Sequence, residues 1–387
     1  MPSSTDPSQI DGLRVLAFCD YFSERPHGGV EKVALEVYRR LTLAGADVRV
    51  VSAVPGAHDA VHEIAGIPTH TLTARNLARL LGSQVSVATG YRRTARRMIE
   101  VAVPDVIHAS GIHFQGSFAA ARLAQNRGIP LVTTTHLGPI SALSNLTRAA
   151  TAAYERTIGR YIIRSSQRLI AVSQAAATHV ARLGDTPVTV VSNGVDHELF
   201  TPSPGRSDEP IEIVFVGRLI ANKGPGLALS AFAALGHPSA RLTFIGDGPT
   251  RTRLERSAEA LDSTVRFVGH QDDVASMLNA AHILLRPSQT EGQSLAILEA
   301  MAAGVCIVAS DIEANRELVT PGETGLLHRT GDVADLTATL RGLLADMGAV
   351  RALGLAGRRV ALLHSWERCA TETGRILANA AKGPGAG

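Results

Sequence analysis

The 387-residue chain has few cysteines and few aromatic residues. Its three cysteines, Cys19, Cys306 and Cys369, form no CxxC pair, and their odd number argues against a disulfide framework. The same spacing offers no zinc site, so the cysteine content is typical of a protein in a reducing cytosol. Aromatic residues make up only 4% of the chain, and alanine, valine, leucine and glycine must therefore fill its cores.

Long apolar runs and several well-known catalytic motifs are absent as well. No run of about 18 apolar residues occurs, and the polar start MPSSTDPSQIDG lacks the basic and apolar regions of a signal peptide. No G-x4-GK[ST], GxSxG or Asp-x-Asp motif is present, which argues against a P-loop NTPase, an α/β-hydrolase and a metal-clamped nucleotide. We expect a cytoplasmic protein, with peripheral contact at the inner membrane face as a further option.

Positive charge is carried almost entirely by arginine, because only three of the 38 basic residues are lysines. Residues 1–190 hold 20 basic and 13 acidic residues, whereas residues 191–387 hold 18 and 22. The net charge of +3 is therefore split between a basic first half and an acidic second half. A basic half could favour a phosphorylated ligand or an anionic membrane surface, or it could reflect the arginine bias alone.

Length and patterning predict two α/β domains. Hydrophobic residues make up 45% of the chain and charged residues 19%, so that two full cores can be buried. Short apolar runs alternate with helical patterns in the first half, as in a parallel sheet covered on both faces. The expected strands are Leu13–Phe18, Asp47–Ala53, Val106–Ala109, Leu131–Thr135, Arg168–Val172 and Val188–Val191. The expected helices are Val30–Ala44, Asn76–Val101, Gln115–Arg127, Arg148–Ile163 and Gln174–Leu183.

The stretch Asp196–Pro210 is rich in proline, serine and charge and is typical of an interdomain linker, after which the alternation restarts. The second set of expected strands is Ile211–Val216, Arg241–Ile245, Val265–Val268, His282–Arg286 and Val305–Ala309. The expected helices are Gly226–Leu235, Thr250–Leu261, Val274–Ala280, Leu295–Ala303, Val333–Met347 and Trp366–Ala380. We predict two Rossmann-like doubly wound domains, residues 1–200 and 201–365, with ligands bound at strand carboxyl edges in a cleft between them.

The strongest motif is PSQTEGQSLAILEAMAAG, which follows the predicted strand HILLR. Glu291 lies on its loop, and Glu299 lies eight residues later inside the predicted helix. The N–H groups of Gln293, Ser294 and Leu295 at the helix start add the positive end of the helix dipole. Carboxylates accept hydrogen bonds from vicinal hydroxyls, so the motif favours a polyhydroxylated ligand. The alternative is a surface loop followed by an ordinary amphipathic helix.

A second motif, FVGRLIANKGPGLAL, places Arg218 and Lys223 between a predicted strand and the next predicted helix. Cations at the start of a helix oppose its macrodipole and are unfavourable there unless an anion is bound. A diphosphate would supply that anion, because arginine can bind it with a fork and lysine as a point charge. The alternative is a pair of solvated surface cations.

Weaker signals follow three other predicted strands. Gly28 and Gly29 in HGGVEKVALE would let the backbone approach a ligand closely, although they form no GxGxxG dinucleotide fingerprint. Gly246 and Gly248 in IGDGPTRTRLE favour a tight turn into a helix. His136 follows the strand LVTTT at a carboxyl edge, where a histidine is either structural or part of a site.

Taken together, six segments resemble retaining glycosyltransferases of family four, which have the GT-B fold. The segments are GGVEKVALE, VVSNGVDHELFTP, VGRLIANKG, IGDGPTRTRLE, VRFVGHQDD and EGQSLAILEAMAAG. They agree with that family in order and spacing and span most of the chain. The resemblance implies an α/β GT-B fold, with two Rossmann-like domains and an interdomain cleft that holds a UDP- or GDP-sugar donor.

The resemblance also implies roles for the residues of the two stronger motifs. Glu291 and Glu299 match the family's paired glutamates, of which the first would contact the donor sugar and the second the nucleotide ribose. The N–H groups at 293–295 would bind the donor as well. Arg218 and Lys223 would hold the diphosphate, so that neither a metal nor another cofactor is expected.

Other segments take roles through the same resemblance. The Gly28–Gly29 loop would line the donor phosphates from the first domain, His136 would lie by the transferred sugar, and Gly269–His270 would lie near the base. The last helix, residues 366–387, would pack back onto the first domain. Many relatives carry an aromatic–glycine pair two residues after the first glutamate, where this chain has Gln293–Ser294.

We therefore predict a retaining glycosyltransferase that moves a sugar to a hydroxyl of a glycan, a glycolipid or a natural product. A sugar-nucleotide epimerase shares the architecture, but the paired glutamates argue against it. An NAD-dependent oxidoreductase lacks its fingerprint here, and a non-catalytic sugar-binding relative would not need the intact motifs. The basic stretch Arg75–Arg97 either touches a membrane or an anionic acceptor, or forms a helix with a solvated polar face. No nucleic-acid partner is expected.

Overall fold

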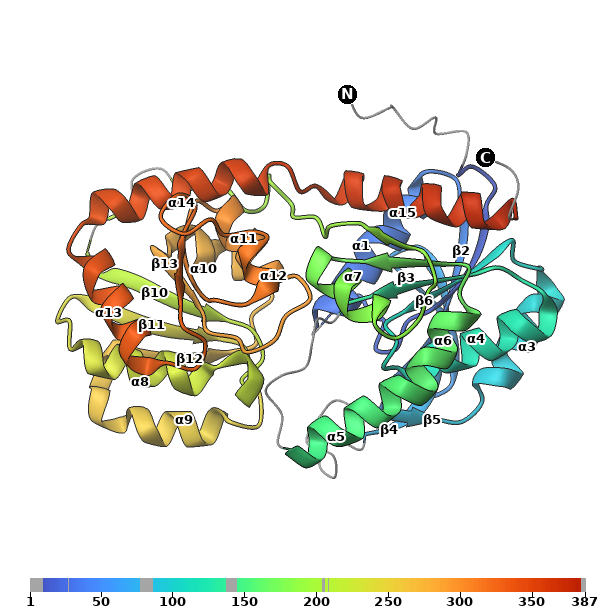
Figure 1. The fold of residues 1–387 in the computed structure, drawn as a ribbon, viewed down its shortest axis with the longest axis horizontal. Helices are drawn as coiled ribbons and strands as arrows, with labels where there is room; N and C mark the ends of the chain where they lie inside the picture. Colours follow the sequence, from blue (N-terminus) through green and yellow to red (C-terminus); the bar gives the residue numbers. More distant parts are fainter. Residues whose placement is uncertain are drawn as a thin grey trace. The chain divides into compact units, whose positions relative to one another are not determined.

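The computed structural model describes residues 10–26, 28–76, 86–136, 145–203, 206–207 and 209–383. These residues form two compact units (Figure 1). The first unit holds the described residues up to 136, Asn145–Asn193 and the chain from Trp366 onward, and the second unit holds Gly194–Ser365. The sequence placed the boundary after residue 200, whereas the chain leaves the first unit after Asn193. The reason is local: the N–H of Val195 donates to the carbonyl of His364 at 3.1 Å, within the second unit.

The first unit alternates strands and helices. Its elements are β1 (Arg14–Phe18), α1 (Gly29–Leu43), β2 (Asp47–Pro55), β3 (Ala60–Ile64), β4 (Ile67–Asn76), β5 (Ser86–Ala88), α3 (Tyr91–Val101), β6 (Val106–Ser110), α4 (Gln115–Arg127), β7 (Leu131–Thr135), α5 (Asn145–Tyr154), the π-helix η2 (Glu155–Gly159), α6 (Arg160–Ser165), β8 (Arg168–Ala171), α7 (Gln174–Ala181), β9 (Val188–Val190) and α15 (Trp366–Ala381).

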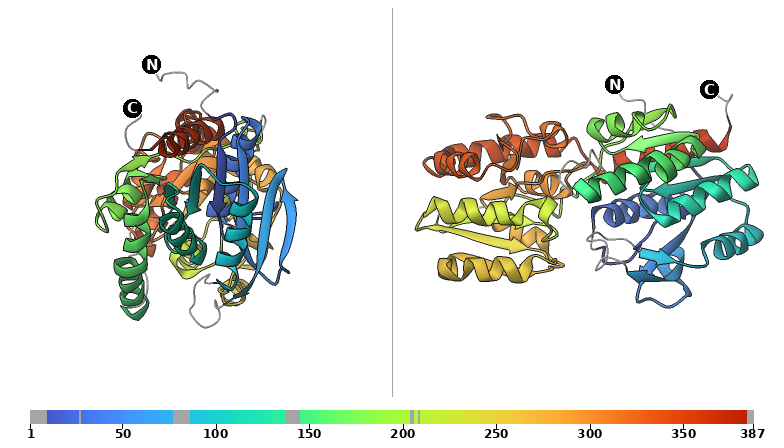
Figure 2. Two further views of the ribbon diagram at one scale, coloured as in Figure 1. Left: turned by 90° about the vertical axis from the view of Figure 1, so that its right-hand side faces the viewer. Right: turned by 60° about the horizontal axis from the view of Figure 1, so that its bottom comes forward.

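The described strands of this unit form a nine-stranded sheet in the order β3-β4-β2-β1-β6-β7-β8-β9, with β5 paired to β4. β1 pairs in parallel with β2 and with β6, and helices cover both faces of the sheet (Figures 1 and 2). Every residue of β6 and β7 is buried as a result. Both strands contain no Asp, Glu, Lys or Arg and are rich in β-branched residues, which explains why they were recognisable in the sequence.

The strands β3, β4 and β5, at one end of the sheet, were not expected. β4 buries Thr69 and Thr71 together with Ile67 and Leu72, so its buried face does not show the apolar alternation of a half-buried strand. The expected helix Asn76–Val101 was wrong at its start, because Asn76 ends β4 and Ser86–Ala88 forms β5. The helix begins only at Tyr91, after a glycine with a φ of +105°. Residues 77–85 lie outside the described part of the chain.

The last helix, α15, packs against α1 in the first unit (Figure 1). Gly374 of α15 packs closely on α1, because an added Cβ would stand only 2.7 Å from Leu41 Cδ2. Arg40 Nε donates to Glu367 Oε1 at 2.9 Å across the same pair of helices. A close small-residue contact and an ion pair thus join the C-terminal helix to the first helix of the chain.

The second unit has its own doubly wound sheet. Its elements are β10 (Ile211–Val216), the 3-10 helix η3 (Ala221–Lys223), α8 (Pro225–Leu235), β11 (Ala240–Ile245), α9 (Arg251–Ala258), the 3-10 helix η4 (Glu259–Thr264), β12 (Val265–Gly269), α10 (Val274–Ala280), β13 (Ile283–Arg286), α11 (Leu295–Ala302), β14 (Cys306–Ser310), α12 (Glu313–Arg316), β15 (Leu326–His328), α13 (Val333–Leu344) and α14 (Met347–Ala361). The strand order is β12-β11-β10-β13-β14-β15, and every neighbouring pair is parallel.

Two apolar clusters cover the two faces of this second sheet. Ile213 and Phe215 of β10 belong to a cluster with α8, α9 and α13. Val214 and Val216, which point the other way, belong to a cluster with α10 and α11. Side chains alternate between the faces of a strand, so β10 is apolar at every position from Ile213 to Val216 to fill both clusters. The same double burial leaves polar side chains to the strand ends, where the loops begin.

Candidate active site

The loops at the carboxyl edge of the second sheet approach one another closely. Gly217 and Gly246 directly follow β10 and β11 and have φ angles of +138° and +132°. A Cβ on Gly246 would stand 2.1 Å from the carbonyl oxygen of Gly217, and a Cβ on Gly217 would stand 2.6 Å from Arg286 Nη1. Only glycine fits both positions. Ligands of open α/β sheets bind at such carboxyl edges.

Glu291, on the loop after β13, is buried at this edge with only 6% of its side chain exposed. Arg286, the last residue of β13, donates to Glu291 Oε1 from Nε at 2.9 Å and lies 2.7 Å from it through Nη2. Lys223 Nζ donates to Glu291 Oε2 at 2.6 Å. One carboxylate therefore holds two cations, one on each oxygen. The structure thus brings together two of the predicted site residues, Lys223 and Glu291.

The backbone holds the two loops of this ion-pair cluster together. The N–H of Gln289 donates to the carbonyl of Asn222 at 2.8 Å. Gly224, with a φ of +73°, lies so close to the other loop that an added Cβ would stand 2.2 Å from the carbonyl oxygen of Pro287. Lys223 closes η3 and precedes α8, so it lies just outside that helix rather than in its first turn.

Burial and neighbouring charges shift the pKa values of the cluster. Burial alone would raise the pKa of Glu291, but the charges of Arg286 and Lys223 lower it to about 2. Burial lowers the pKa of Lys223 to about 8; Glu291 opposes that shift, and Arg286 and Arg218 add to it. At neutral pH two cations, Lys223 and Arg286, therefore share one carboxylate, and the charge of Arg218 acts on Lys223 as well. Such a gathering of cations favours an anionic ligand.

The helix after Glu291 begins with a serine cap. Ser294 is the N-cap of α11, and its Oγ accepts a hydrogen bond from the N–H of Ile297 at 3.4 Å. The serine that replaces the family's glycine thus stabilises the start of this helix. Gln293 and Leu295 flank the cap and are half-buried, whereas Glu299 is buried in the second turn of the helix.

Gly269 ends β12, and His270 follows it at the same edge of the sheet. The N–H of Gly246 donates to the carbonyl of Gly269 at 2.7 Å, which joins the ends of β11 and β12. Gly269 has a φ of +73°, a conformation that favours glycine. The side chain of His270 is 48% exposed and lies 3.9 Å from Asp272. Both residues are thus on the second unit's carboxyl edge, as are Arg218, Lys223 and Glu291.

The remaining predicted site residues, Gly28, Gly29 and His136, lie in the first unit. Gly28 is the N-cap of α1, and its N–H donates to Glu31 Oε2 at 3.0 Å. Its φ of −142° is accessible to any residue, so no backbone strain requires glycine there. A Cβ at Gly28 would stand 3.1 Å from Glu31 Oε1. The close approach of Glu31 accounts for the small residue at this position.

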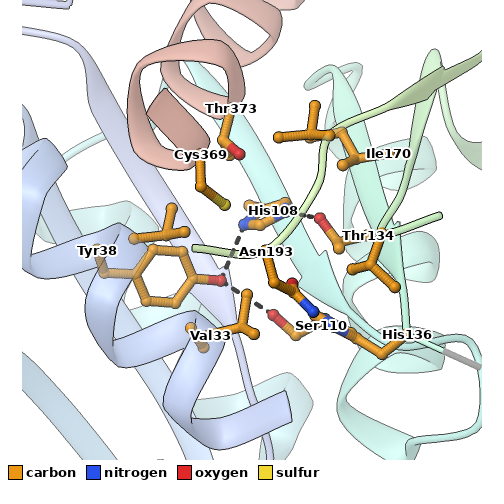
Figure 3. A pocket seen from close by; sticks show the side chains of 14 residues that line it. Val33, Tyr38, His108, Ser110, Thr134, His136, Ile170, Asn193, Cys369 and Thr373 are labelled. Carbon is orange, nitrogen blue, oxygen red and sulfur yellow. Dashed lines mark hydrogen bonds between the residues drawn. The ribbon is translucent and has the colours of Figure 1, made fainter. Parts of the chain in front are cut away.

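His136 follows β7 and lines a small cavity in the first unit (Figure 3). The cavity measures about 20 Å³, enough for one water molecule. His108 bonds to Tyr38 Oη at 2.9 Å and to Thr134 Oγ1 at 2.8 Å, and Ser110 Oγ lies 3.2 Å from the same Tyr38 oxygen. Burial lowers the pKa of His136 to about 4, so its imidazole is neutral at neutral pH. Its Nε2 is buried without a hydrogen-bond partner.

Arg286 is a site residue that sequence analysis missed. The only signal was an arginine at the end of the apolar run HILLR. A buried charge needs a partner, and an arginine at the last position of a buried strand can turn either to solvent or to the strand-end loops. The structure shows that it turns to the loops and bonds to Glu291.

A second missed cluster lies in the first unit. His113 Nε2 and His179 Nε2 lie 2.9 and 3.1 Å from Glu155 Oε1. Burial would raise the pKa of Glu155, but its hydrogen bonds to the two histidines lower it to about 2. Glu155 opens the π-helix η2, and the two histidines come from the loop after β6 and from α7. No short-range sequence pattern connects these three elements.

Within the described residues, no group of three or more histidine, cysteine, aspartate or glutamate side chains is arranged to hold a metal ion. In that same part of the chain, none of the helices combines the length and the apolar character needed to cross a membrane. The helix α3 presents four exposed arginines, Arg92, Arg93, Arg96 and Arg97. This basic face is part of the stretch Arg75–Arg97. Either it contacts a membrane or an anionic acceptor, as one expectation had it, or it faces solvent alone.

Both halves of the chain match known families. The family model described as Glycosyltransferase Family 4 matches residues 27–199, and the model described as Glycosyl transferases group 1 matches residues 210–346. A glycogen synthase of Mycobacterium tuberculosis is 32% identical over 292 residues, which cover 72% of this chain and 70% of the relative. The chain belongs to the group 1 glycosyltransferases of family four. A D-inositol 3-phosphate glycosyltransferase of Rhodococcus erythropolis is also 32% identical, over 87% of this chain and 80% of the relative.

Solved structures share the fold of this glycosyltransferase. A sucrose-phosphate synthase from Thermosynechococcus elongatus has a TM-score of 0.81 and 22% identity, covering 94% of this chain and 98% of its own. Anabaena HepE, in complex with UDP-glucose, has a TM-score of 0.75 and 19% identity, covering 95% and 100%. The predictions of a GT-B fold and of a glycosyltransferase are confirmed. The epimerase and oxidoreductase alternatives are therefore set aside.

Proposed function

We propose that this glycosyltransferase uses a nucleoside-diphosphate sugar and transfers the sugar, with retention at its anomeric carbon, to a hydroxyl of an acceptor. The observation that carries the proposal is the pair of cations that share one buried carboxylate at the carboxyl edge of the second sheet. Lys223 and Arg286 are both bonded to Glu291, and Arg218 is close enough to lower the pKa of Lys223. A diphosphate would balance this charge. The complex of HepE with UDP-glucose supports a donor of this kind.

In the proposed mechanism, Arg218 and Lys223 stabilise the leaving group. As the bond between the sugar and the diphosphate breaks, Arg218 and Lys223 neutralise the charge that develops on the phosphate. Lys223 is mostly protonated at neutral pH, because its lowered pKa is still about 8. The acceptor hydroxyl attacks from the face that the phosphate leaves, and the departing phosphate takes the hydroxyl proton. This geometry retains the configuration of the anomeric carbon.

The carboxylates of Glu291 and Glu299 are proposed to accept hydrogen bonds from hydroxyls of the donor. Glu291 is ionised at any pH near neutrality, so it accepts hydrogen bonds from sugar hydroxyls and donates none. Glu299, buried eight residues later in α11, is the proposed partner of the nucleotide ribose. We also propose the roles that the family resemblance implies for the remaining residues, which are Gly28, Gly29, His136, Gly269 and His270.

The acceptor belongs to a broad chemical class, a hydroxyl on a glycan, a glycolipid or a natural product. The relatives differ in this respect, since one is named as a glycogen synthase and another as a D-inositol 3-phosphate glycosyltransferase. The acceptor must therefore be identified by a screen. Once the donor is known, fewer acceptors need to be tested.

Thermal unfolding in the presence of nucleotides tests the proposal without an acceptor. The purified protein is heated with UDP, GDP, ADP or NAD in buffer that contains EDTA. A ligand at about 100 times its Kd should add roughly 2.7 kcal/mol to the stability of the folded protein. We expect one nucleoside diphosphate to raise the melting temperature in EDTA and NAD to have no effect. Stabilisation by NAD alone, or by none of the four, would overturn the proposed donor site.

A matched pair of variants locates the binding site. Lys223→Ala should abolish most of the thermal shift, because it removes a proposed diphosphate ligand. Arg253→Ala removes an exposed charge on α9 of the same unit and should leave the shift intact. A full shift in Lys223→Ala would place the nucleotide elsewhere.

A further inference from the structure

Arg286 joins three parts of the second unit through one buried guanidinium. Its Nη1 donates to the carbonyl of Val216, the last residue of β10, at 2.6 Å. Its Nε donates to Glu291 Oε1 at 2.9 Å, and Nη2 lies 2.7 Å from the same oxygen. Only 7% of the side chain is exposed. The guanidinium therefore links the ends of β10 and β13 to the carboxylate of the following loop.

The space for this guanidinium is provided by a neighbouring glycine. A Cβ at Gly217 would stand 2.6 Å from Arg286 Nη1, so any larger residue at 217 would collide with the guanidinium. Arg286 is thus held by a strand carbonyl on one side and by Glu291 on the other. These contacts leave the side chain little freedom to turn toward a ligand.

Lys223 binds the same carboxylate through fewer contacts and is more exposed than Arg286. It bonds to Glu291 through its Nζ alone, at 2.6 Å, and 16% of its side chain is exposed. A lysine has four rotatable side-chain bonds and no fixed fork, so its ammonium can exchange one anion for another by rotation. Of the two cations on Glu291, Lys223 is the one that can leave.

Charge balance decides whether that exchange is favourable. If Lys223 turns to a diphosphate, Glu291 still has Arg286 as a partner. Without Arg286, the same movement would strand a buried carboxylate with no cation bonded to it. Leaving one partner of a buried ion pair uncompensated is strongly unfavourable. The second cation on Glu291 therefore makes the release of the first one possible.

We propose that Arg286 is a positioning residue of the donor site, which keeps Glu291 ionised and in place while Lys223 leaves the carboxylate for the donor's diphosphate. This inference rests on the proposed function, because it requires that Lys223 bind a diphosphate. It goes beyond that function by assigning a role to a residue outside the motifs that define the site.

A double-mutant cycle on nucleotide binding tests the inference. The probe is whichever of UDP, GDP and ADP stabilises the wild-type protein most, and its Kd is measured by calorimetry for wild type, Arg286→Met, Glu291→Gln and the double variant. A nucleoside diphosphate lacks the transferred sugar, and its ribose is assigned to Glu299, so Glu291 loses no proposed hydroxyl partner in this measurement. We expect Arg286→Met to weaken binding about tenfold or more, because the carboxylate then retains Lys223. In the double variant no carboxylate remains, and binding should return to within about twofold of wild type.

Two further variants separate this role from a purely structural one. Arg206 is a half-buried arginine of the same unit that donates to the carbonyls of Asn279 and Ala303, away from Glu291. Arg206→Met should lower the melting temperature without changing the Kd. Arg286→Lys keeps the charge but cannot reach both Val216 and Glu291, and it should weaken binding less than Arg286→Met. It serves as the test variant if Arg286→Met does not fold.

The outcomes distinguish the two proposals. If no nucleoside diphosphate binds wild type, the proposed function fails and the role of Arg286 fails with it. If wild type binds and Arg286→Met binds equally well, only the role of Arg286 fails. The same holds if the loss in Arg286→Met persists in the double variant, because a merely structural arginine would not act through the carboxylate.

Discussion

Replacing Glu291 by glutamine removes an anion that is bonded to both Arg286 and Lys223. In the folded protein the pKa of Glu291 falls from 4.5 to about 2. A difference of that size contributes about 3 kcal/mol to the free energy of unfolding at pH 7. Because the folded-state pKa is the lower one, the contribution is present above the unfolded pKa and is lost as the pH falls through the folded value. The Glu291→Gln variant should therefore be about 3 kcal/mol less stable than wild type at pH 7, and about 1 kcal/mol less stable at pH 3.

Two spectroscopic probes can assign the loss to the second unit. The single tryptophan, Trp366, is buried in α15 of the first unit, so its fluorescence follows that unit. Circular dichroism in the far ultraviolet follows the helices of both units. In urea, which is uncharged, a loss of about 3 kcal/mol should move the transition of the second unit by about 1 M or more. If the units unfold separately, the tryptophan transition should not move.

The pH dependence is the decisive part of this experiment. A gap between wild type and Glu291→Gln that stays constant from pH 7 to pH 3 would show that the substitution acts through packing and not through charge. A variant as stable as wild type at pH 7 would refute the reasoning altogether. Glu323→Gln, at an exposed position of the same unit, is the control and should change stability little at any pH.

Three other predictions follow from the structure. Alanine at Lys223 or at Arg218 should lower kcat about 100-fold or more, measured as nucleoside diphosphate release, and near-normal turnover by both variants would exclude them as the groups that stabilise the leaving phosphate. Glu155→Gln should destabilise the first unit, and because the pKa of Glu155 is lowered to about 2, its contribution should fade as the pH drops from about 4.5 to about 2. An unmoved Trp366 transition would contradict that account. Glutamine at all four exposed arginines of α3 should reduce binding to anionic vesicles by about 1 kcal/mol per residue, whereas equal sedimentation with wild type would assign that face to solvent.

Much of the fold was predictable because a sheet covered on both faces needs apolar strands. The expected bounds of Ile211–Val216 coincide with those of β10, in which every residue except Glu212 is apolar. β3 and β4 escaped prediction for the opposite reason. β3 is exposed at every residue except Ile64, and β4 buries Thr69 and Thr71 beside its aliphatic residues, so neither strand carries the apolar pattern that marks a strand in a sequence.

The site residues that could be predicted lie in sequence motifs, whereas those that could not are brought to the site only by the fold. Arg218, Lys223 and Glu291 stand in segments whose spacing the family shares, so their roles could be proposed before any coordinates. Arg286 could not be assigned in the same way. Whether its guanidinium points to solvent or inward depends on the room left by Gly217 and on the carbonyl of Val216, 70 residues away in the chain. The contacts of a charged side chain at the end of a buried strand are therefore set by the neighbouring strand. For that reason the inferred role of Arg286 depends on the pairing of β10 with β13 and not on any local motif.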